Sequence, residues 1–321
     1  MTVPDLAREE LRRSAPGRTC AVTIGKFDGV HRGHQHLIRA FLAAARERDL
    51  ASVVITLHPN PLTVLRPGLP ITYLCSLDER LALLRALGPD RVGMLSFTSE
   101  LSQLTAREFV ELLMQELSMR MLFIGPDLTL GRSREGTPEV LRALGEELGF
   151  ELVVADVLAE DGTKVGSSAV RQALAAGEME RAADLLGRTY SLSGPVVVGE
   201  RRGRQLGFPT ANIGIAHDLA LPAYGVYITR AHLDGVAYQS STNIGVRPTF
   251  EEEAWPTIEA YLLDFQGDIY GRQVQLDMLH RLRDELKFDR IEELVAAIEG
   301  DVTDTRRYFQ ALATISSKAA Q

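Results

Sequence analysis

Residues 20–38 read CAVTIGKFDGVHRGHQHLI, and this stretch decides the fold of the first half of the chain. Its first six residues form an apolar, β-rich run, which predicts a buried strand. A glycine-rich turn follows, and apolar residues then recur at three- and four-residue spacing, which predicts an amphipathic helix. That apolar stripe consists of Leu37, Phe41 and Ala44 or Ala45.

The alternation of strand and helix continues to about residue 188. Five short apolar runs are typical of buried strands: 20–25, 52–57, 91–97, 120–125 and 151–157. Four amphipathic segments lie between them: 34–49, 77–88, 105–117 and 137–149. We therefore expect a Rossmann-like α/β domain with a parallel sheet covered on both faces. Ligands of such domains bind at the carboxyl ends of the strands.

The second half of the chain is nearly all strand. Its β-rich runs are 190–200, 224–233, 236–245, 257–265 and 273–282. Sequential antiparallel strands of this length predict a small β-barrel, followed by one terminal helix over 289–313. Two short helices, 167–177 and 179–187, close the first half, so we expect domains at 1–186 and 187–321.

Composition narrows the class of protein. The 321 residues include 35 basic and 43 acidic side chains, a net charge of -8, which argues against a nucleic-acid or membrane-surface binder. The 45% hydrophobic content excludes disorder. Cys20 and Cys75 lack the spacing of a zinc or disulfide framework. The longest uncharged run, 50–65, contains two prolines and cannot span a bilayer, so we expect a soluble cytoplasmic protein.

Two histidines, His31 and His34, stand where the predicted turn meets the predicted helix. A helix N-terminus offers free N–H groups and a positive dipole end, which suit phosphate. Gly29 and Gly33 let a nucleotide approach, and two imidazoles stabilise charge growing on an attacked α-phosphate. The alternative is a plain helix cap. A zinc site with His36 is less favoured, because no cysteine pair or nearby carboxylate completes a tetrahedral set.

The segment Gly166-Ser167-Ser168-Ala169-Val170-Arg171 begins a helix after the fifth predicted strand. Its hydroxyls either cap the helix or donate to a phosphate, and the arginine follows one turn later. Taken alone, a plain cap with a solvated arginine is the simpler interpretation. Residues 131–137 approach a phosphate-binding P-loop but lack its lysine, so we reject that motif and keep them as a candidate nucleotide or flavin edge.

Residues 199–212, GERRGRQLGFPTAN, combine glycines and arginines suited to polyphosphate. Thr210 and Asn212 offer two neutral oxygens on one side of an extended segment, and such oxygens suit Mg²⁺. An ordinary turn with a solvated arginine cluster is the alternative. Glu259 lies in an apolar strand pattern, where a carboxylate can take the proton from an attacking hydroxyl. A plain outward-facing glutamate is the other interpretation.

These motifs carry a resemblance. The run FDGVHRGH at 27–34, with Ser-Ser-x-x-Arg at 167–171, resembles the HxGH nucleotidyltransferase superfamily. More narrowly, the chain is similar to bacterial bifunctional riboflavin kinase/FAD synthetases. Their kinase half carries Gly-Phe-Pro-Thr-Ala-Asn and then segments like 243–250 and 257–265, in this order. The likeness runs from about residue 19 to residue 313.

The resemblance implies roles for individual residues. In the first domain, the catalytic and phosphate-contacting side chains are His31, His34, Ser167, Ser168 and Arg171. Further nucleotide contacts are implied at Gly25, Phe27, Asp28, Gly33, Gly207 and Pro209. In the kinase half, the general base is Glu259 and the ligands of Mg-ATP are Thr210 and Asn212. Flavin contacts are implied at Asn60, Asp127 and Arg247.

The first half departs from the family pattern at three places. The family's Ser-Ser-Thr-x-x-Arg has Gly166 at its start here, which leaves two hydroxyls. Its Pro-His-Pro has Asn60 in the middle. Its Phe-x-Phe-Gly has Leu128 and Leu130, and losing two aromatic rings weakens stacking on a flavin or an adenine. We therefore expect adenylyl transfer to be the more fragile activity.

The resulting hypothesis is a two-step enzyme of flavin cofactor synthesis. The barrel phosphorylates riboflavin with Mg-ATP to give FMN, and the first domain transfers AMP from a second ATP to FMN, giving FAD and pyrophosphate. We expect these small molecules, and neither nucleic acid nor membrane, as binding partners. Three alternatives stay open: a kinase with a degenerate first domain, a non-catalytic flavin-binding protein, and another HxGH transferase with an accessory β domain.

Overall fold

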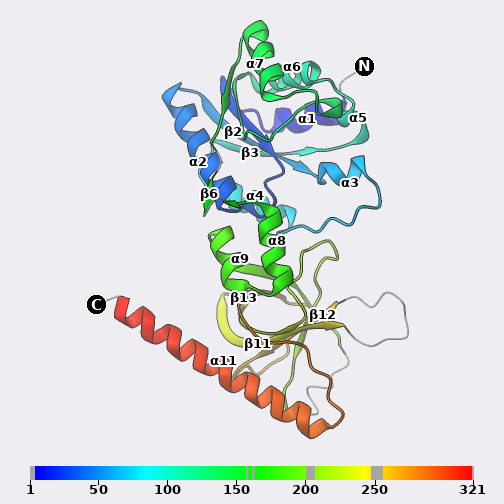
Figure 1. Cartoon of the computed structure of the whole chain (residues 1–321), viewed down its shortest axis with the longest axis vertical. Coiled ribbons are helices and arrows are strands. Elements are labelled where there is room, and N and C mark those ends of the chain that lie inside the picture. Colours follow the sequence, from blue (N-terminus) through cyan, green and yellow to red (C-terminus); the bar gives the residue numbers. More distant parts are fainter. Residues whose placement is uncertain (1–3, 157, 161–162, 200–206, 247–255, 320–321) are drawn as a thin grey trace. The chain divides into compact units, whose positions relative to one another are not determined.

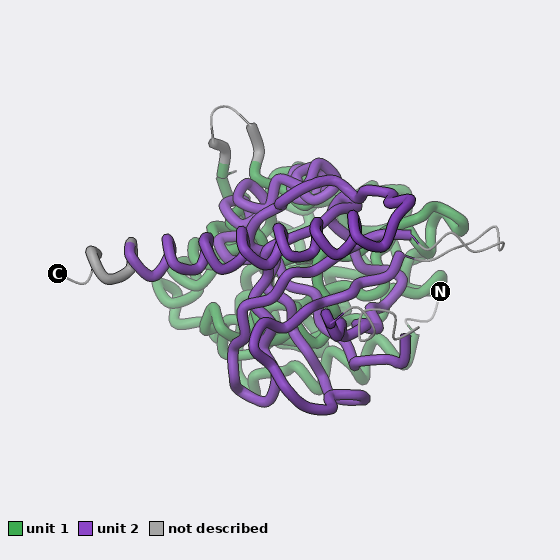
Figure 2. Tube along the Cα trace, turned by 90° about the horizontal axis from the view of Figure 1, so that it is seen from below, with its two compact units in different colours: residues 1–167 green, residues 168–321 purple. Residues whose placement is uncertain are grey.

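The structure is a computed structural model that describes residues 4–156, 158–160, 163–199, 207–246 and 256–319. Contacts between residues divide the chain into two compact units, Met1–Ser167 and Ser168–Gln321, which Figure 2 colours separately. Each unit has its own sheet.

The first unit is built on a parallel sheet of five strands in the order β3-β2-β1-β4-β5 (Figure 1). Their bounds are β1 Cys20–Gly25, β2 Ala51–His58, β3 Arg91–Ser96, β4 Met119–Ile124 and β5 Glu151–Val154. These are the five strands that the sequence predicts, and the expected α/β architecture is confirmed. The order reverses at β1, so the turn that follows β1 lies where ligands of such sheets bind.

Helices cover both faces of this sheet, as the strand pattern of β1 requires. Cys20 and Val22 pack into one core with helices α1, α6 and α7, while Ala21 packs into a second core with α2 and α4. The helices are α1 Asp5–Arg13, α2 Arg32–Glu47, α3 Pro61–Leu65, α4 Leu77–Ala86, α5 Ser99–Ser102, α6 Ala106–Leu117 and α7 Pro138–Leu148. Short elements complete the unit: η1 Asp28–Val30, η2 Arg132–Arg134, β6 Ala159–Glu160 and β7 Thr163–Lys164.

Helix α1 has no counterpart in the sequence-based expectations. It buries Ala7 and Leu11 in the core and lies against the edge strand β3. Its Glu10 accepts hydrogen bonds from the backbone N–H of Ser96 at 2.7 Å and from the Ser96 hydroxyl at 2.6 Å. A side chain of α1 thus satisfies a backbone donor of an edge strand that would otherwise be free to pair with another chain.

The second unit contains the predicted antiparallel barrel, which is confirmed. It closes in the order β10-β11-β12-β9-β8-β13. The strands are β8 Tyr190–Val197, β9 Ala211–Ile213, β10 Gly225–Leu233, β11 Val236–Val246, β12 Pro256–Leu262 and β13 Gln273–Arg283. Strand β9 is a short addition to the five predicted runs, and it pairs with β12 and β8 to close the barrel. Helix α11, Ile291–Ala319, packs against β11 and β10 (Figure 1).

The two short helices α8, Ser167–Ala176, and α9, Met179–Leu186, are counted with the barrel in the contact division. The physical reason is that α9 packs on β8 and β13, and its Glu180 pairs with His280 on β13. The division therefore falls earlier than the boundary at 186 that the change of pattern suggests. Among helices of the described residues, none combines the length and apolar content needed to cross a membrane.

Candidate functional site

The turn after β1 has an unusual backbone. Phe27 has φ 45°, Gly29 has φ 75° and Val30 has φ 41°, all in the left-handed region. Such values are costly for a β-branched residue, so the surrounding structure must hold the turn in place. Phe27 and Val30 are both buried, at 3% and 2% exposure, and they pack in the core under α2. The turn ends at His31, the N-cap of α2.

His31 and His34 lie together, as the motif requires. Their rings stack with centroids 3.6 Å apart, and the backbone N–H of His34 donates to Nδ1 of His31 at 3.3 Å. His31 is 4% exposed. Since Nδ1 accepts this hydrogen bond, the proton of the neutral ring sits on Nε2. His31 is therefore a helix cap through one ring nitrogen and a hydrogen-bond donor through the other.

Gly33 has a steric reason to be glycine. A Cβ at this position would lie 2.5 Å from the carbonyl oxygen of Val165 and 3.2 Å from the His31 ring. Gly25, at the end of β1, lies under the ring of Phe27, and that ring makes an edge contact with His34 at 5.3 Å between centroids. Phe27 is buried, so it supports the histidine and does not present a face to solvent.

Asp28 connects three segments at the carboxyl edge of the sheet. Its Oδ1 accepts the backbone N–H of Leu74 at 2.8 Å, and its own carbonyl oxygen accepts the hydroxyl of Ser167 at 3.1 Å. Asp28 is 3% exposed. The first serine of the Ser-Ser-x-x-Arg motif is therefore brought to the FDG turn, as expected for a shared site.

The remaining residues predicted for the first site have different surroundings. Asn60 is buried, and its side-chain oxygen caps α3 by accepting the N–H of Leu62 at 3.1 Å. Asp127 is exposed just after β4, at the same edge of the sheet. Ser168 is exposed and Arg171 is half-buried on α8, beyond the point where the contact division falls. The predicted flavin contact Arg247 lies outside the described residues.

Sequence reasoning missed two residues behind this turn, Arg80 and Tyr73. Arg80 is 1% exposed on α4, and its guanidinium donates to the carbonyl oxygens of Lys26 and Leu57 at 3.1 and 3.3 Å. The only signal in the sequence is its spacing: it stands one helical turn before the buried Leu84, on the apolar face of the helix.

Burial also controls the thiol next to this turn. It raises the pKa of Cys75 to about 11, and the acidic side chains of Glu79 and Asp28 add to the effect. The backbone N–H of Gly29 makes a hydrogen bond to the same group. Cys75 is therefore a neutral thiol packed against the turn.

The kinase-like residues come together through strand pairing. Glu259 on β12 is the register partner of Asn212 on β9, and the hydroxyl of Thr210 donates to Oε2 of Glu259 at 3.4 Å. Along β12 the buried Ile258 and Ala260 alternate with Glu259, which is half-buried on the outer side of the barrel. Glu259 thus faces outward, as the simpler interpretation has it, but it meets two other predicted site residues there.

Gly199, just after β8, and Phe208, before β9, both pack close to this group. A Cβ at Gly199 would lie 2.3 Å from the amide nitrogen of Asn212, so the backbone of residue 199 abuts that side chain. Phe208 makes an edge contact with Tyr261, with centroids 5.5 Å apart. Gly207 and Pro209 are both exposed. The arginines predicted to wrap polyphosphate, at 201, 202 and 204, lie outside the described residues.

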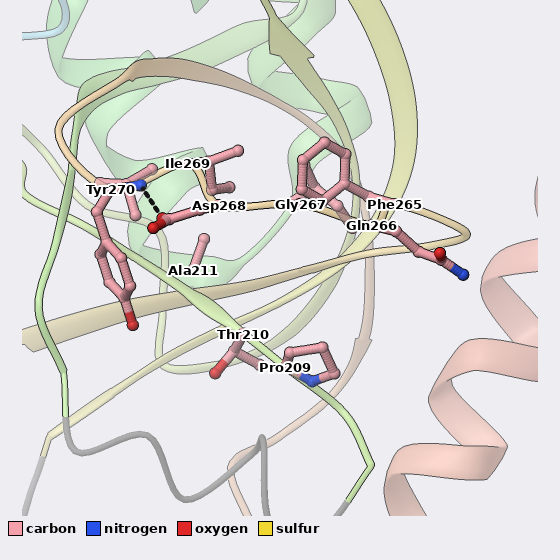
Figure 3. A pocket seen from close by; sticks show the side chains of 11 residues that line it. Pro209, Thr210, Ala211, Phe265, Gln266, Gly267, Asp268, Ile269 and Tyr270 are labelled. Carbon is pink, nitrogen blue, oxygen red and sulfur yellow. Dashed lines mark hydrogen bonds between the residues drawn. The ribbon is translucent and has the colours of Figure 1, made fainter.

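A cavity of about 350 Å³ opens beside Thr210 (Figure 3). Its lining residues are Val196, Pro209, Thr210, Ala211, Leu262 and 265–270. The walls are partly aliphatic and aromatic, which suits a planar ring, and Figure 3 shows Pro209 and Thr210 side by side along the segment before β9. Across the cavity, Asp268 accepts the N–H of Tyr270 at 3.0 Å.

The oxygens around Glu259 fit a hard cation. Thr210 and Asn212 alternate on one segment, so both side chains face the side on which Glu259 stands. Hydroxyl, amide and carboxylate oxygens are the ligands that Mg²⁺ prefers, together with water and phosphate. Within the part of the chain that the structure describes, no cluster of three or more histidine, cysteine or acidic side chains is arranged to hold a metal ion.

The two units therefore define a class of protein. A parallel α/β unit with an HxGH turn is followed by an antiparallel barrel with an outward-facing carboxylate, a threonine and an asparagine. Family models match both halves in this order: FAD synthetase over residues 14–169 and riboflavin kinase over residues 186–309.

Individual proteins agree with the family models. The bifunctional riboflavin kinase/FMN adenylyltransferase of Escherichia coli strain K12 is 36% identical over 302 residues, covering 92% of this chain and 94% of its own. That of Bacillus subtilis strain 168 is 34% identical and covers 96% of both chains. This chain belongs to the bifunctional riboflavin kinase/FMN adenylyltransferase family.

A solved structure has a similar fold along most of the chain. The crystal structure of a macrolide-efflux protein from Streptococcus pneumoniae has a TM-score of 0.85 and 31% sequence identity, and it covers 95% of this chain and 98% of its own. Macrolide efflux is the activity in that protein's name, and neither family model describes it.

Proposed function

We propose that this chain carries out both reactions of its family. The barrel half transfers the γ-phosphoryl group of ATP to the primary ribityl hydroxyl of riboflavin, giving FMN and ADP. The α/β half joins the FMN phosphate to the α-phosphorus of a second ATP, giving FAD and pyrophosphate. We place the two domains at residues 1–186 and 187–321. The observation that carries the proposal is the presence of both residue sets on one chain, whose first part matches the FAD synthetase model and whose second part matches the riboflavin kinase model.

In the first domain, the chemistry is mainly the handling of charge. The FMN phosphate is already a nucleophile, so no strong base is needed, and the site must position the reactants and stabilise negative charge at the α-phosphate. His31 is suited to this task because its Nδ1 is occupied by the cap, so that Nε2–H is the donor. His34 stacks on it, and Ser167, Ser168 and Arg171 complete the phosphate contacts.

In the barrel, Glu259 is proposed as the general base that takes the proton of the riboflavin hydroxyl. Thr210 and Asn212 would hold Mg²⁺ with ATP, and the bound cation would neutralise charge on the phosphates. The cavity beside Thr210 has the size and the partly apolar lining for the ring of a substrate, and the hydroxyl of its lining residue Thr210 donates to the proposed base.

Product analysis tests the proposal. The purified chain is incubated with ATP and Mg²⁺ and either riboflavin or FMN, and flavins, nucleotides and pyrophosphate are separated by chromatography. We expect FMN with equimolar ADP in the first arm, followed by FAD, and FAD with equimolar pyrophosphate in the second. If FMN forms from riboflavin in the first arm but no FAD forms from supplied FMN in the second, the chain is a riboflavin kinase only. If neither FMN nor FAD forms in either arm, the chain is a flavin-binding protein without catalytic activity.

A further inference from the structure

The most completely buried charged side chain described in the first unit is Arg80, at 1% exposure. It stands on α4, where Arg85, one turn and a half later, is exposed. Burying a guanidinium is unfavourable unless hydrogen bonds and an opposite charge compensate for the lost water. Its Nε and one terminal nitrogen have no hydrogen-bond partner among the described residues. The chain therefore keeps a buried cation whose hydrogen bonds are incomplete.

The hydrogen bonds that Arg80 does make go to the site. One terminal nitrogen donates to the carbonyl oxygens of Lys26, in the turn after β1, and of Leu57, near the end of β2. The other lies 4.0 Å from Oδ1 of Asp28, which is 4% exposed along its side chain. A single guanidinium thus bridges the ends of two neighbouring strands and places a positive charge beside the aspartate of the FDG turn.

Tyr73 extends this connection to a third segment. Arg80 lies over its ring, with the guanidinium carbon 5.4 Å from the ring centroid. The Tyr73 hydroxyl accepts the backbone N–H of Asn60 at 2.8 Å, at the start of α3. The next residue, Leu74, donates its N–H to Asp28. The two side chains therefore contact the turn after β1 and the loop after β2 from behind.

We propose that Arg80 and Tyr73 are positioning residues for adenylyl transfer, a role that rests on the proposed function of the first domain. Arg80 holds the turn carrying Asp28 and His31 at a fixed distance from the end of β2. Tyr73 holds the start of the loop at Asn60. Displacing reacting groups by about 1 Å costs up to about 100-fold in rate, so a bridge between the two segments acts directly on turnover. A side chain kept at a cost to stability is expected where function requires it.

Arg80→Met and Arg80→Lys test the bridge. Arg80→Met keeps the length of the side chain and removes both the charge and the donors, and we expect kcat for FAD formation from FMN to fall about 100-fold. Arg80→Lys keeps the charge beside Asp28, and we expect it to recover about tenfold of that loss. Riboflavin phosphorylation on the same chain should stay within about twofold of wild type, which reports that the barrel remains folded.

Tyr73→Phe separates the two roles, because it keeps the ring under Arg80 and removes only the acceptor of the Asn60 N–H. We expect the KM for FMN to rise about fivefold while kcat stays within about twofold. Arg85→Met, on the exposed side of the same helix, is the matched control and should leave both activities unchanged. Equal losses of both activities in Arg80→Met, with no recovery by lysine, would overturn the proposal in favour of a purely structural role.

Amide hydrogen exchange tests the positioning role of Arg80 without an assay of enzyme activity. In full-length Arg80→Met, the amides of 26–31 and 60–62 should exchange about tenfold faster than in wild type, while amides of the barrel strands are unchanged. Unchanged exchange in both segments would overturn the proposal, whatever the rates show. If wild type forms no FAD from FMN but exchange still rises in Arg80→Met, the proposed function fails and the bridge stands.

Discussion

The two candidate sites of this chain hold their residues in different ways. In the first unit, His31 and Asp28 lie on a turn with left-handed backbone, and side chains from other segments hold that turn. In the second unit, Glu259 and Asn212 lie on paired strands, and the hydrogen-bond ladder of the barrel fixes which residues face each other.

This difference determines which substitutions each site tolerates. A turn has no ladder of its own, so its geometry depends on individual side-chain hydrogen bonds, and removing one of them changes the site. A strand register is shared by many backbone hydrogen bonds, so it survives the loss of any single side chain. The barrel site is therefore sensitive mainly to its own functional groups and to backbone positions that abut them.

The largest expected effects come from removing one proposed catalytic group in each unit. His31→Ala should lower FAD formation from FMN by about 10²- to 10³-fold, because a donor to the developing charge is lost. Glu259→Ala should lower FMN formation from riboflavin by about 10²- to 10⁴-fold, the usual contribution of a general base. Each variant should keep the other activity, so that riboflavin and ATP give FMN without FAD in the first case. Chromatography of the products measures both.

Matched controls exist for both variants. His36 is exposed on the first turns of α2, and Glu299 is exposed on α11, so His36→Ala and Glu299→Ala should leave both activities at wild-type rates. If folded His31→Ala and Glu259→Ala each lost both activities equally, the assignment of one reaction to each unit would be wrong.

An intermediate effect is expected from Gly199→Ala. The new methyl group would lie 2.3 Å from the amide nitrogen of Asn212 and must push that side chain away from Thr210 and Glu259. We expect kinase kcat to fall about tenfold, because a ligand-holding group is displaced while the base stays in place. The Mg²⁺ concentration for half-maximal kinase activity should rise in parallel, and FAD formation from FMN should be unaffected. A titration of both activities with Mg²⁺ measures these changes.

Gly300→Ala is the control for a methyl group in the same unit. Gly300 lies in α11, and a Cβ added there would meet no neighbouring atom within 4 Å, so the change should leave kinase activity alone. Replacing a mid-helix glycine should also stabilise the helix by about 0.5–1 kcal/mol. Wild-type kinase rates and an unchanged Mg²⁺ dependence in Gly199→Ala would show that the position of the Asn212 amide does not matter.

Sequence patterns predicted those elements of this chain that have a periodic apolar pattern or a regular motif spacing. Five parallel strands and most barrel strands follow from apolar runs, and the pairing of His31 with His34 follows from their spacing at a helix start. Strand β9 has only three residues, too few for a periodicity, and α1 pairs with a distant strand through Glu10. Neither property is encoded in a local pattern.

The contacts of Arg80 behind the first turn were also not predictable from a local sequence pattern. Arg80 is a charged residue in a helix with an otherwise ordinary amphipathic pattern, and helix surfaces commonly carry arginine. Its burial depends on Lys26, Leu57 and Tyr73, which are not its neighbours on the helix. Contacts of a single polar side chain with other segments leave no period to detect. The candidate catalytic residues were therefore predicted from motifs, whereas the contacts of Arg80 and Tyr73 behind them were visible only in the structure.

The last test makes the smallest change to the site, because it measures the reactivity of a thiol, and it examines how tightly the first turn is held. Burial raises the pKa of Cys75 to about 11, and that of Cys20 to about 12, so both are protonated at about pH 8. In a Cys20→Ser background, native Cys75 should react with iodoacetamide about 100-fold more slowly than an ordinary thiol with a pKa near 8.5, because the thiolate is the nucleophile. Its rate should keep rising as pH increases from about 8 toward about 11, whereas an ordinary thiol levels off above about 9. A rate at about pH 8 equal to that of the urea-unfolded chain would mean that the segment next to Asp28 opens freely, and the contrast between a side-chain-held turn and a register-held strand pair would lose its structural basis.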